Sequence, residues 1–176
     1  MNVRVYTKTW HILSLVPILE ELNINYKIFT KYNVEFEKNY TTSIHDDKPF
    51  DLGVSYGYSR KILPPLLTYP KLGFINFHSA PLPEYPGGDP YSVGLDKKVR
   101  RWGVTCHYMT EEYDQGQIIA KQYFDVNPAN RIELVRAAYL ELLKLFKQVM
   151  ASFANESKGQ VCSLRQEEQG QEKASI

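Results

Sequence analysis

The first third of the chain alternates short apolar runs with an amphipathic segment. Residues 2–7, which include the apolar Val3 and Val5, and residues 26–29 predict two strands. Between them, residues 10–22 carry apolar side chains at helical spacing, and Pro17 predicts either a start or a kink in that helix. A strand, a helix and a strand in this order predict a parallel pair with a right-handed crossover.

The remaining pattern extends this arrangement. It predicts a long polar connector at 32–49, a strand at 51–56, a short helix at 60–67 broken by Pro64-Pro65, a strand beginning at Phe74, a helix at 90–99, strands at 104–109 and 117–126, and a helix at 132–153. Asn130 and Glu133 have the spacing of a capping box before the last helix. The sum is an α/β fold: a mostly parallel, twisted sheet with a late antiparallel hairpin and helices on both faces.

Size and composition restrict the classes of protein to which this chain can belong. The 176 residues, with a formal net charge of +1, predict one domain over residues 1–154 and a weakly structured tail, or the remnant of a C-terminal module, over 155–176. The near-zero charge and the lack of a long apolar run argue against nucleic acid and membrane partners. Two cysteines and an N-terminus without a signal pattern favour the cytoplasm. The histidines show no metal-ligand spacing, so no metal is expected.

Two polar clusters stand out from this background. In GFINFHSAPLPEYPGG (73–88), Asn76 and His78 alternate on one face of a strand that ends in a proline-stiffened loop. A second cluster, EEYDQG (111–116), places Asp114 on a turn between two strands. The structural alternative is that Asn76 is a turn former, His78 a core histidine and Asp114 a turn aspartate.

Together the three side chains allow one kind of chemistry. A carboxamide donates a hydrogen bond to a developing oxyanion, and an imidazole accepts a proton near neutral pH. A nearby carboxylate raises the basicity of the imidazole and orients it. These roles suit acyl transfer to an amine without a covalent enzyme intermediate.

The two clusters resemble the motifs of the formyltransferases that use 10-formyltetrahydrofolate. Residues 76–88, NFHSAPLPEYPGG, resemble N-x-H…LP…G, and GVTCHYM followed by EEYDQGQII resembles GVT-h-h-x-M…D-x-G-x-I. The resemblance covers residues 1–154 and implies a Rossmann-like formyltransferase fold with Asn76, His78 and Asp114 as the catalytic residues. It also implies a folate slot, bound largely through main-chain groups, at Tyr58, Ser59, Arg60, Ile62, Leu63, Thr110, Glu111 and Tyr113.

The same resemblance restricts which molecule can accept the formyl group. The chain lacks the glycine-rich phosphate loop of glycinamide-ribonucleotide formyltransferases, and the basic insertion of methionyl-tRNA formyltransferases. Its motifs look most like enzymes that formylate nucleotide-linked amino sugars, which implies a dTDP-4-amino-4,6-dideoxy sugar as acceptor. On this interpretation Tyr85 borders the sugar and Trp10 or Tyr91 covers the nucleotide. The alternatives are a formyltetrahydrofolate hydrolase, a glycinamide-ribonucleotide or methionyl-tRNA formyltransferase, and a catalytically silent folate- or sugar-nucleotide-binding module. A homodimer stays open.

Overall fold

The computed structural model describes residues 1–30, 49–62 and 64–159. Its centre is a six-stranded sheet with the order β2-β1-β3-β4-β5-β6. The strands are β1 (Asn2–Thr7), β2 (Asn25–Phe29), β3 (Leu52–Tyr56), β4 (Phe74–His78), β5 (Arg101–Tyr108) and β6 (Ile118–Asp125). The first four run parallel, and β5 and β6 follow as antiparallel neighbours. The predicted mostly parallel sheet with a late hairpin is confirmed.

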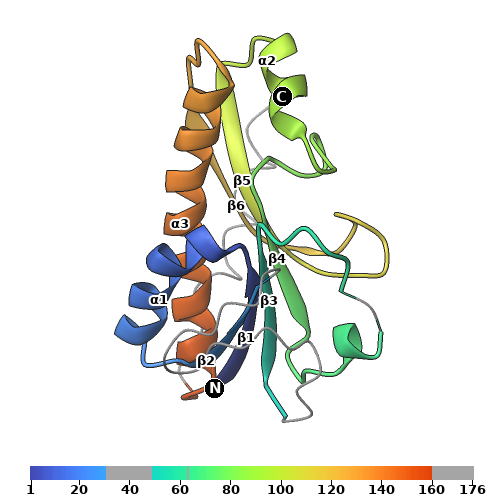
Figure 1. The fold of residues 1–176 in the computed structure, drawn as a ribbon, viewed down its shortest axis with the longest axis vertical. Coiled ribbons are helices and arrows are strands. Elements are labelled where there is room, and N and C mark those ends of the chain that lie inside the picture. The colour runs from blue at the N-terminus through green and yellow to red at the C-terminus, as the bar shows by residue number, and fades with distance from the viewer. Residues whose placement is uncertain (31–48, 63, 160–176) are drawn as a thin grey trace, which may run out of the picture.

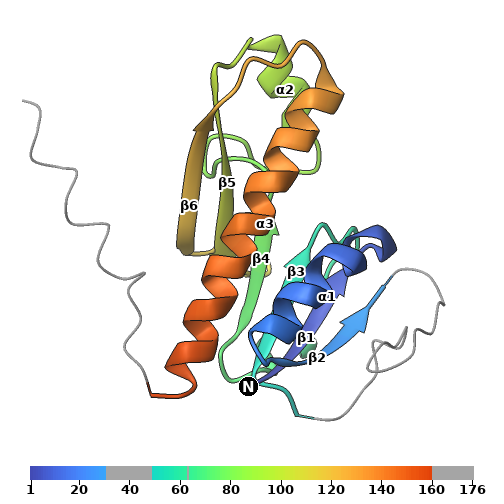
Figure 2. The same cartoon turned by 90° about the vertical axis from the view of Figure 1, so that its left-hand side faces the viewer.

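The long helices α1 (Ile12–Glu21) and α3 (Arg131–Glu156) lie side by side on one face of this sheet (Figures 1 and 2). Two contacts join them: Tyr139 donates a hydrogen bond to Ser14, and Lys147 forms an ion pair with Glu21. The shorter helices are η1 (Thr9–His11), η2 (Leu66–Thr68) and α2 (Pro90–Asp96).

The alternation of side chains along the strands divides the core in two. Under α1 and α3, one cluster includes Ile75 and Phe77 of β4 and the fully buried Trp102 of β5. On the other face, Phe74 belongs to a second cluster that Leu67 of η2 covers. Since successive residues of a strand point to opposite faces, Asn76 and His78 share the face of Phe74.

The helix expected over residues 60–67 is wrong. Among the described residues of this part of the chain, helical structure is confined to the three residues of η2. Pro64 and Pro65 have no backbone N–H to donate, and a residue before proline is disfavoured in the helical region. The helix expected at 90–99 likewise ends early, at Asp96.

The two other predicted helices form, with shifted starts. The one expected at 10–22 opens as η1 and continues as α1 straight through Pro17, so the helix does not start at that proline. At the start of α3, Glu133 N–H donates to Asn130 Oδ1 over 3.1 Å. The Glu133 carboxylate accepts from Ala129 N–H instead of completing the box on Asn130 itself. The connector at 32–49, apart from its last residue, and most of the tail lie outside the described residues.

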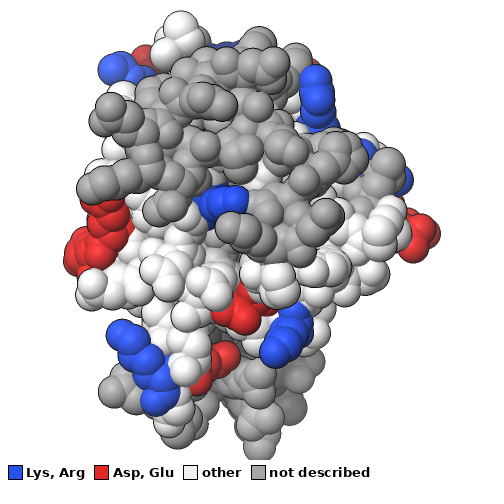
Figure 3. Space-filling model, turned by 60° about the horizontal axis from the view of Figure 1, so that its bottom comes forward, with Lys and Arg blue, Asp and Glu red and all other residues white. Residues whose placement is uncertain are grey.

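In the face shown in Figure 3, basic and acidic side chains of the described residues are interspersed. Among the helices of the described ranges, none is long and apolar enough to cross a membrane.

Candidate active site

A cleft of about 760 Å³ opens at the carboxyl ends of β3 and β4. Its walls come from the loop after β3, the segment after β4, the β5–β6 connector, the segment after β1 and one side of α3. In open α/β sheets this edge is where ligands bind, because loops there extend beyond the strands and are free of sheet pairing. Asn76, His78 and Asp114 all line this cleft.

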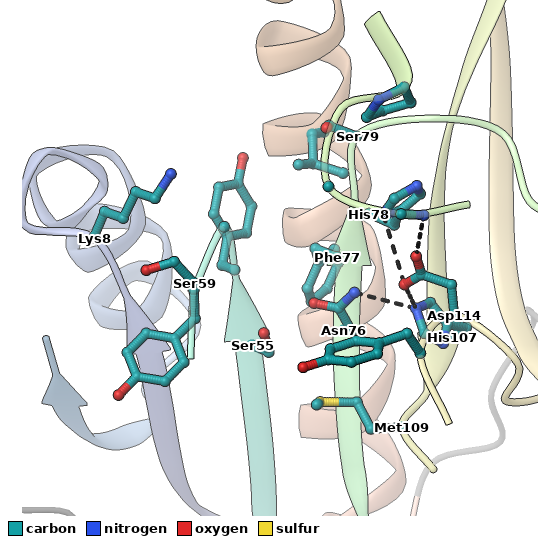
Figure 4. A pocket seen from close by; sticks show the side chains of 18 of the residues that line it. Lys8, Ser55, Ser59, Asn76, Phe77, His78, Ser79, His107, Met109 and Asp114 are labelled. Carbon is teal, nitrogen blue, oxygen red and sulfur yellow. Dashed lines mark hydrogen bonds and ion pairs between the residues drawn. The ribbon is translucent and has the colours of Figure 1, made fainter. Parts of the chain in front are cut away.

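The structure brings the three predicted catalytic side chains together (Figure 4). Asn76 and His78 come from the end of β4, and Asp114 comes from the β5–β6 connector. Asp114 Oδ1 lies 3.8 Å from His78 Nδ1, although the two residues are far apart in the chain. Asp114 has a φ of +57°, and its Oδ2 accepts the backbone N–H of Gly87 over 2.8 Å. The loop after β4 therefore positions the carboxylate.

The hydrogen bonds of His78 decide which ring nitrogen is basic. His78 Nε2 lies 2.9 Å from the carbonyl oxygen of Tyr85. A carbonyl oxygen only accepts, so Nε2 carries the proton and Nδ1 keeps the lone pair in the neutral ring. Nδ1 is the nitrogen that faces Asp114. A proton taken up at Nδ1 is therefore stabilised by the carboxylate.

The electrostatics keep His78 neutral and Asp114 ionised. Burial lowers the pKa of His78, and Asp114 and the Tyr85 carbonyl oppose that shift only in part. Burial raises the pKa of Asp114, but the neighbouring His107, the hydrogen bond from the Gly87 N–H and the nearby His78 outweigh it, so its pKa lies below the usual value. Near neutral pH the pair is thus an unprotonated imidazole beside a carboxylate.

His107 is a site residue that the sequence analysis missed. It pairs directly with Asn76 across the β4–β5 ladder, and its ring is buried. Its Nδ1 donates to the Tyr108 carbonyl over 2.8 Å, so its Nε2 accepts a hydrogen bond from Asn76 Nδ2 over 3.1 Å. Asn76 keeps a second N–H to donate elsewhere. The alternation of residues 104–109 could have placed His107 on one face of a strand. Its position beside Asn76 depends on the antiparallel register of β4 and β5, which the sequence does not show.

Seven residues of the expected folate slot line the cleft. Tyr58, Ser59, Arg60 and Ile62 come from the loop after β3, and Thr110, Glu111 and Tyr113 come from the β5–β6 connector. Ile62 is buried, whereas Tyr113 is exposed and lies against the ammonium of Lys61 at 5.4 Å. Half-buried Tyr58 also contacts the ring of Tyr6 at 5.7 Å, so it is partly a core residue. Leu63 lies outside the described residues.

Two of the three residues expected to contact the acceptor also line the cleft. Trp10 has 62% of its surface exposed there, and Tyr91 is half-buried. The side chain of Tyr85 lies elsewhere, because its ring packs against Trp102 at 4.8 Å. Tyr85 contributes to the site through its carbonyl oxygen instead. Within the described ranges, no group of three or more His, Cys, Asp or Glu side chains could hold a metal ion.

Comparison with known proteins agrees with this geometry. A family model described as formyl transferase matches residues 18–146. The chain belongs to the formyl transferase family. Among curated relatives of the family, the methionyl-tRNA formyltransferase of Bacillus licheniformis is 35% identical over 82 residues, which are 47% of this chain and 26% of that protein. The aligned part of this chain therefore spans about a quarter of that relative.

Solved structures of formyltransferases share the fold. Glycinamide ribonucleotide transformylase 1 of Symbiobacterium toebii has a TM-score of 0.72 at 18% identity, covering 89% of this chain and 88% of that one. The N-formyltransferase of Helicobacter canadensis, in complex with folinic acid and dTDP-3-aminofucose, has a TM-score of 0.69 at 17% identity, covering 89% and 64%. The Rossmann-like formyltransferase fold expected from the motifs is confirmed.

Proposed function

We propose that this protein transfers the formyl group of 10-formyltetrahydrofolate to the amino group of a nucleotide-linked amino sugar, with a dTDP-4-amino-4,6-dideoxy sugar as the leading candidate. The observation that carries the proposal is the meeting of Asn76, His78 and Asp114 in one cleft. Membership in the formyl transferase family supports the reaction class. The Helicobacter canadensis N-formyltransferase, crystallised with a dTDP-linked amino sugar, supports the acceptor class.

The chemistry follows from the hydrogen bonds of the site. The acceptor amine attacks the formyl carbon, and the carbonyl oxygen becomes an oxyanion that accepts the second N–H of Asn76. His78 Nδ1 takes the proton that the nitrogen loses on attack, and Asp114 stabilises the resulting imidazolium. The bond from the formyl carbon to N10 of the folate then breaks, and N10 receives the proton that His78 took up, which returns the imidazole to its neutral form. The products are the formamide and tetrahydrofolate, so atoms and charge balance.

The two loops that flank the catalytic residues fit the folate. The cleft volume of about 760 Å³ is within the range of sites that enclose a molecule of this size. Ile62 and Met109 supply apolar surface for a flat ring, and the loops at 58–62 and 110–113 supply main-chain donors and acceptors. Lys61 and Arg60 add positive charge that suits the carboxylates of the folate tail.

A second candidate function is formylation of methionyl-tRNA. The observation in its favour is the 35% identity to a methionyl-tRNA formyltransferase over 82 residues. The formal net charge of +1 favours the smaller acceptor, because tRNA binding depends on contacts between basic residues and phosphates.

The test is an acceptor panel. The full chain is incubated with 10-formyltetrahydrofolate and, separately, dTDP-linked amino sugars, glycinamide ribonucleotide, methionyl-tRNA or water alone, and both products are measured by mass spectrometry. A formylated nucleotide sugar is the expected product. Tetrahydrofolate release that needs no acceptor would make the protein a hydrolase, and release with one of the other acceptors would assign that substrate. No release and no binding of folinic acid would make it a silent module.

A further inference from the structure

One wall of the cleft carries a guanidinium that is already bound to a carboxylate. Arg131, the first residue of α3, lines the cleft and forms an ion pair with Asp89 in the segment before α2. Ser92 donates to the same carboxylate over 2.8 Å, and the guanidinium lies 5.4 Å from the ring centre of Tyr91. The contacts hold the cation at the cleft edge.

This ion pair can be exchanged for another anion. Both side chains have 51% of their surface exposed, and an exposed ion pair contributes little to stability. A phosphate group carries more negative charge than a carboxylate and matches the planar fork of arginine with two parallel hydrogen bonds. A phosphate that enters the cleft therefore competes with Asp89 for Arg131 on favourable terms.

The wall continues from Arg131 to a second cation. Arg131, Val135 and Tyr139 are spaced four residues apart on α3 and all line the cleft. Tyr139 stacks on His11, with 5.5 Å between the ring centres. Trp10 and Lys8, which precede His11 in the chain, also line the cleft. Burial and the neighbouring Lys8 lower the pKa of His11 to about 4, so its ring adds no charge.

The acidic residues of the cleft are confined to one connector. Its three acidic lining residues within the described ranges, Glu111, Glu112 and Asp114, all belong to the β5–β6 connector. Lys8 comes from the side of the cleft opposite His78 and Asp114 (Figure 4). Of the basic residues that line the cleft within the described ranges, Arg60 and Lys61 lie on the loop proposed for the folate tail, so Lys8 and Arg131 are left for an anion of the acceptor.

We propose that Arg131 is the subsite for the phosphate or diphosphate group of the acceptor, and that Asp89 is a placeholder which the acceptor displaces. The proposal rests on the function proposed above for its choice of acceptor. Asp89 is two residues from Gly87, whose N–H holds Asp114, and two residues span at most about 7 Å. An anion at Arg131 thus binds beside the loop that positions the catalytic carboxylate.

The experiment compares three variants of the full chain. Inorganic pyrophosphate and dTDP are titrated into the wild type, Arg131→Ala, Asp89→Asn and the control Arg136→Ala, which removes the same charge from an exposed position of α3 that does not line the cleft. Calorimetry gives the affinities, and circular dichroism checks the fold. Arg131→Ala should weaken binding about tenfold, as expected for a lost charged hydrogen-bond partner. Arg136→Ala should leave binding unchanged.

Asp89→Asn separates a placeholder from a structural contact. A placeholder competes with the ligand, so its neutralisation should tighten pyrophosphate binding by up to about fivefold, the effect of an exposed ion pair. If the pair only braces the loop, Asp89→Asn and Arg131→Ala should weaken binding together, and the proposal would be wrong. Equal affinity in the wild type and Arg131→Ala, or no pyrophosphate and dTDP binding by the wild type, would also overturn it.

Formyl transfer by the same variants keeps this proposal apart from the function. If the wild type binds pyrophosphate through Arg131 but formylates no acceptor, the proposed function fails and the anion subsite is left without an acceptor. If the wild type formylates a nucleotide sugar and Arg131→Ala leaves the KM for that sugar unchanged, the subsite is refuted and the function stands. The expected result is a KM for the sugar about tenfold higher, with the KM for folate unchanged.

Discussion

The carboxylate of Asp114 lies 3.6 Å from Nε2 of His107, slightly closer than the 3.8 Å that separates it from Nδ1 of His78. The same nitrogen accepts a hydrogen bond from Asn76, so His107 contacts two of the three catalytic side chains. Because its ring is buried and its other nitrogen is bonded to a backbone carbonyl, His107 has little freedom to turn. We infer that it positions Asn76 through this hydrogen bond and Asp114 through packing contact only.

Replacing His107 tests this positioning role. His107→Leu should lower kcat roughly tenfold or more and leave the KM for folate within a few-fold, because it frees Asn76 and Asp114 without touching the folate loops. His107→Gln, which keeps a hydrogen-bonding group, should recover part of the loss. Steady-state kinetics on both variants provide the measurement. Equal kcat values for Leu and Gln would speak against a role through hydrogen bonding.

His78 and Asp114 should account for most of the proton transfer. We expect His78→Ala and Asp114→Asn each to lower turnover by roughly a hundredfold or more, in line with the contribution of general bases. The fold should persist, as judged by circular dichroism. The double variant should lose little more than His78→Ala alone, since the two residues act as one unit. Near-normal turnover in either single variant would contradict their assigned roles.

The pH profile should report the pKa of His78. The active form is the neutral imidazole, so kcat should be full above the pKa of His78 and fall as pH drops through it. Burial places that pKa below the ordinary value of about 6.5. Asp114 raises the pKa of His78, so Asp114→Asn should move the acid limb to lower pH as well as lower the plateau. A limb that moves to higher pH would show that another group titrates.

Gly87 and Gly88 form a matched pair of sites in the loop after β4. A Cβ atom would meet nothing within 4 Å at either position, but only Gly87 has a positive φ, of +92°. Gly87→Ala should therefore strain the backbone whose N–H holds Asp114, and lower kcat about tenfold. Gly88→Ala should have close to wild-type kinetics. Equal effects of the two substitutions would indicate that the loop is not what positions Asp114.

Gly116 closes the connector that carries Asp114. A Cβ atom there would lie 1.6 Å from the carbonyl oxygen of Tyr108, so Gly116→Ala must open the β5–β6 hairpin. We expect a loss of roughly 1–3 kcal/mol in the free energy of unfolding, as for other overpacked sites, together with reduced kcat. Urea unfolding followed by circular dichroism measures the first. An unfolding midpoint equal to that of the wild type would show that the connector relaxes without cost.

The elements themselves could be predicted from local pattern. Alternating or helical spacing of apolar residues identified all six strands and both long helices. Each element buries one of its sides, so the spacing of its apolar residues follows the period of a strand or a helix. The cap of α3 was equally local, since Asn130 and Glu133 lie within one turn. The error at 60–67 arose where two prolines removed donors from a segment with helical apolar spacing.

Which side chains meet was decided by the tertiary structure. The motifs named Asn76, His78 and Asp114, but His107 joined them only through the antiparallel register of β4 and β5. Tyr85 acts through a carbonyl oxygen, and Arg131 reaches Asp89 from the start of a distant helix. Every residue has a backbone carbonyl, so the residue type does not reveal which carbonyl contributes to a site. A strand register depends on partners far away in the chain. Sequence alone therefore determined the elements and the chemistry available, while packing determined its geometry.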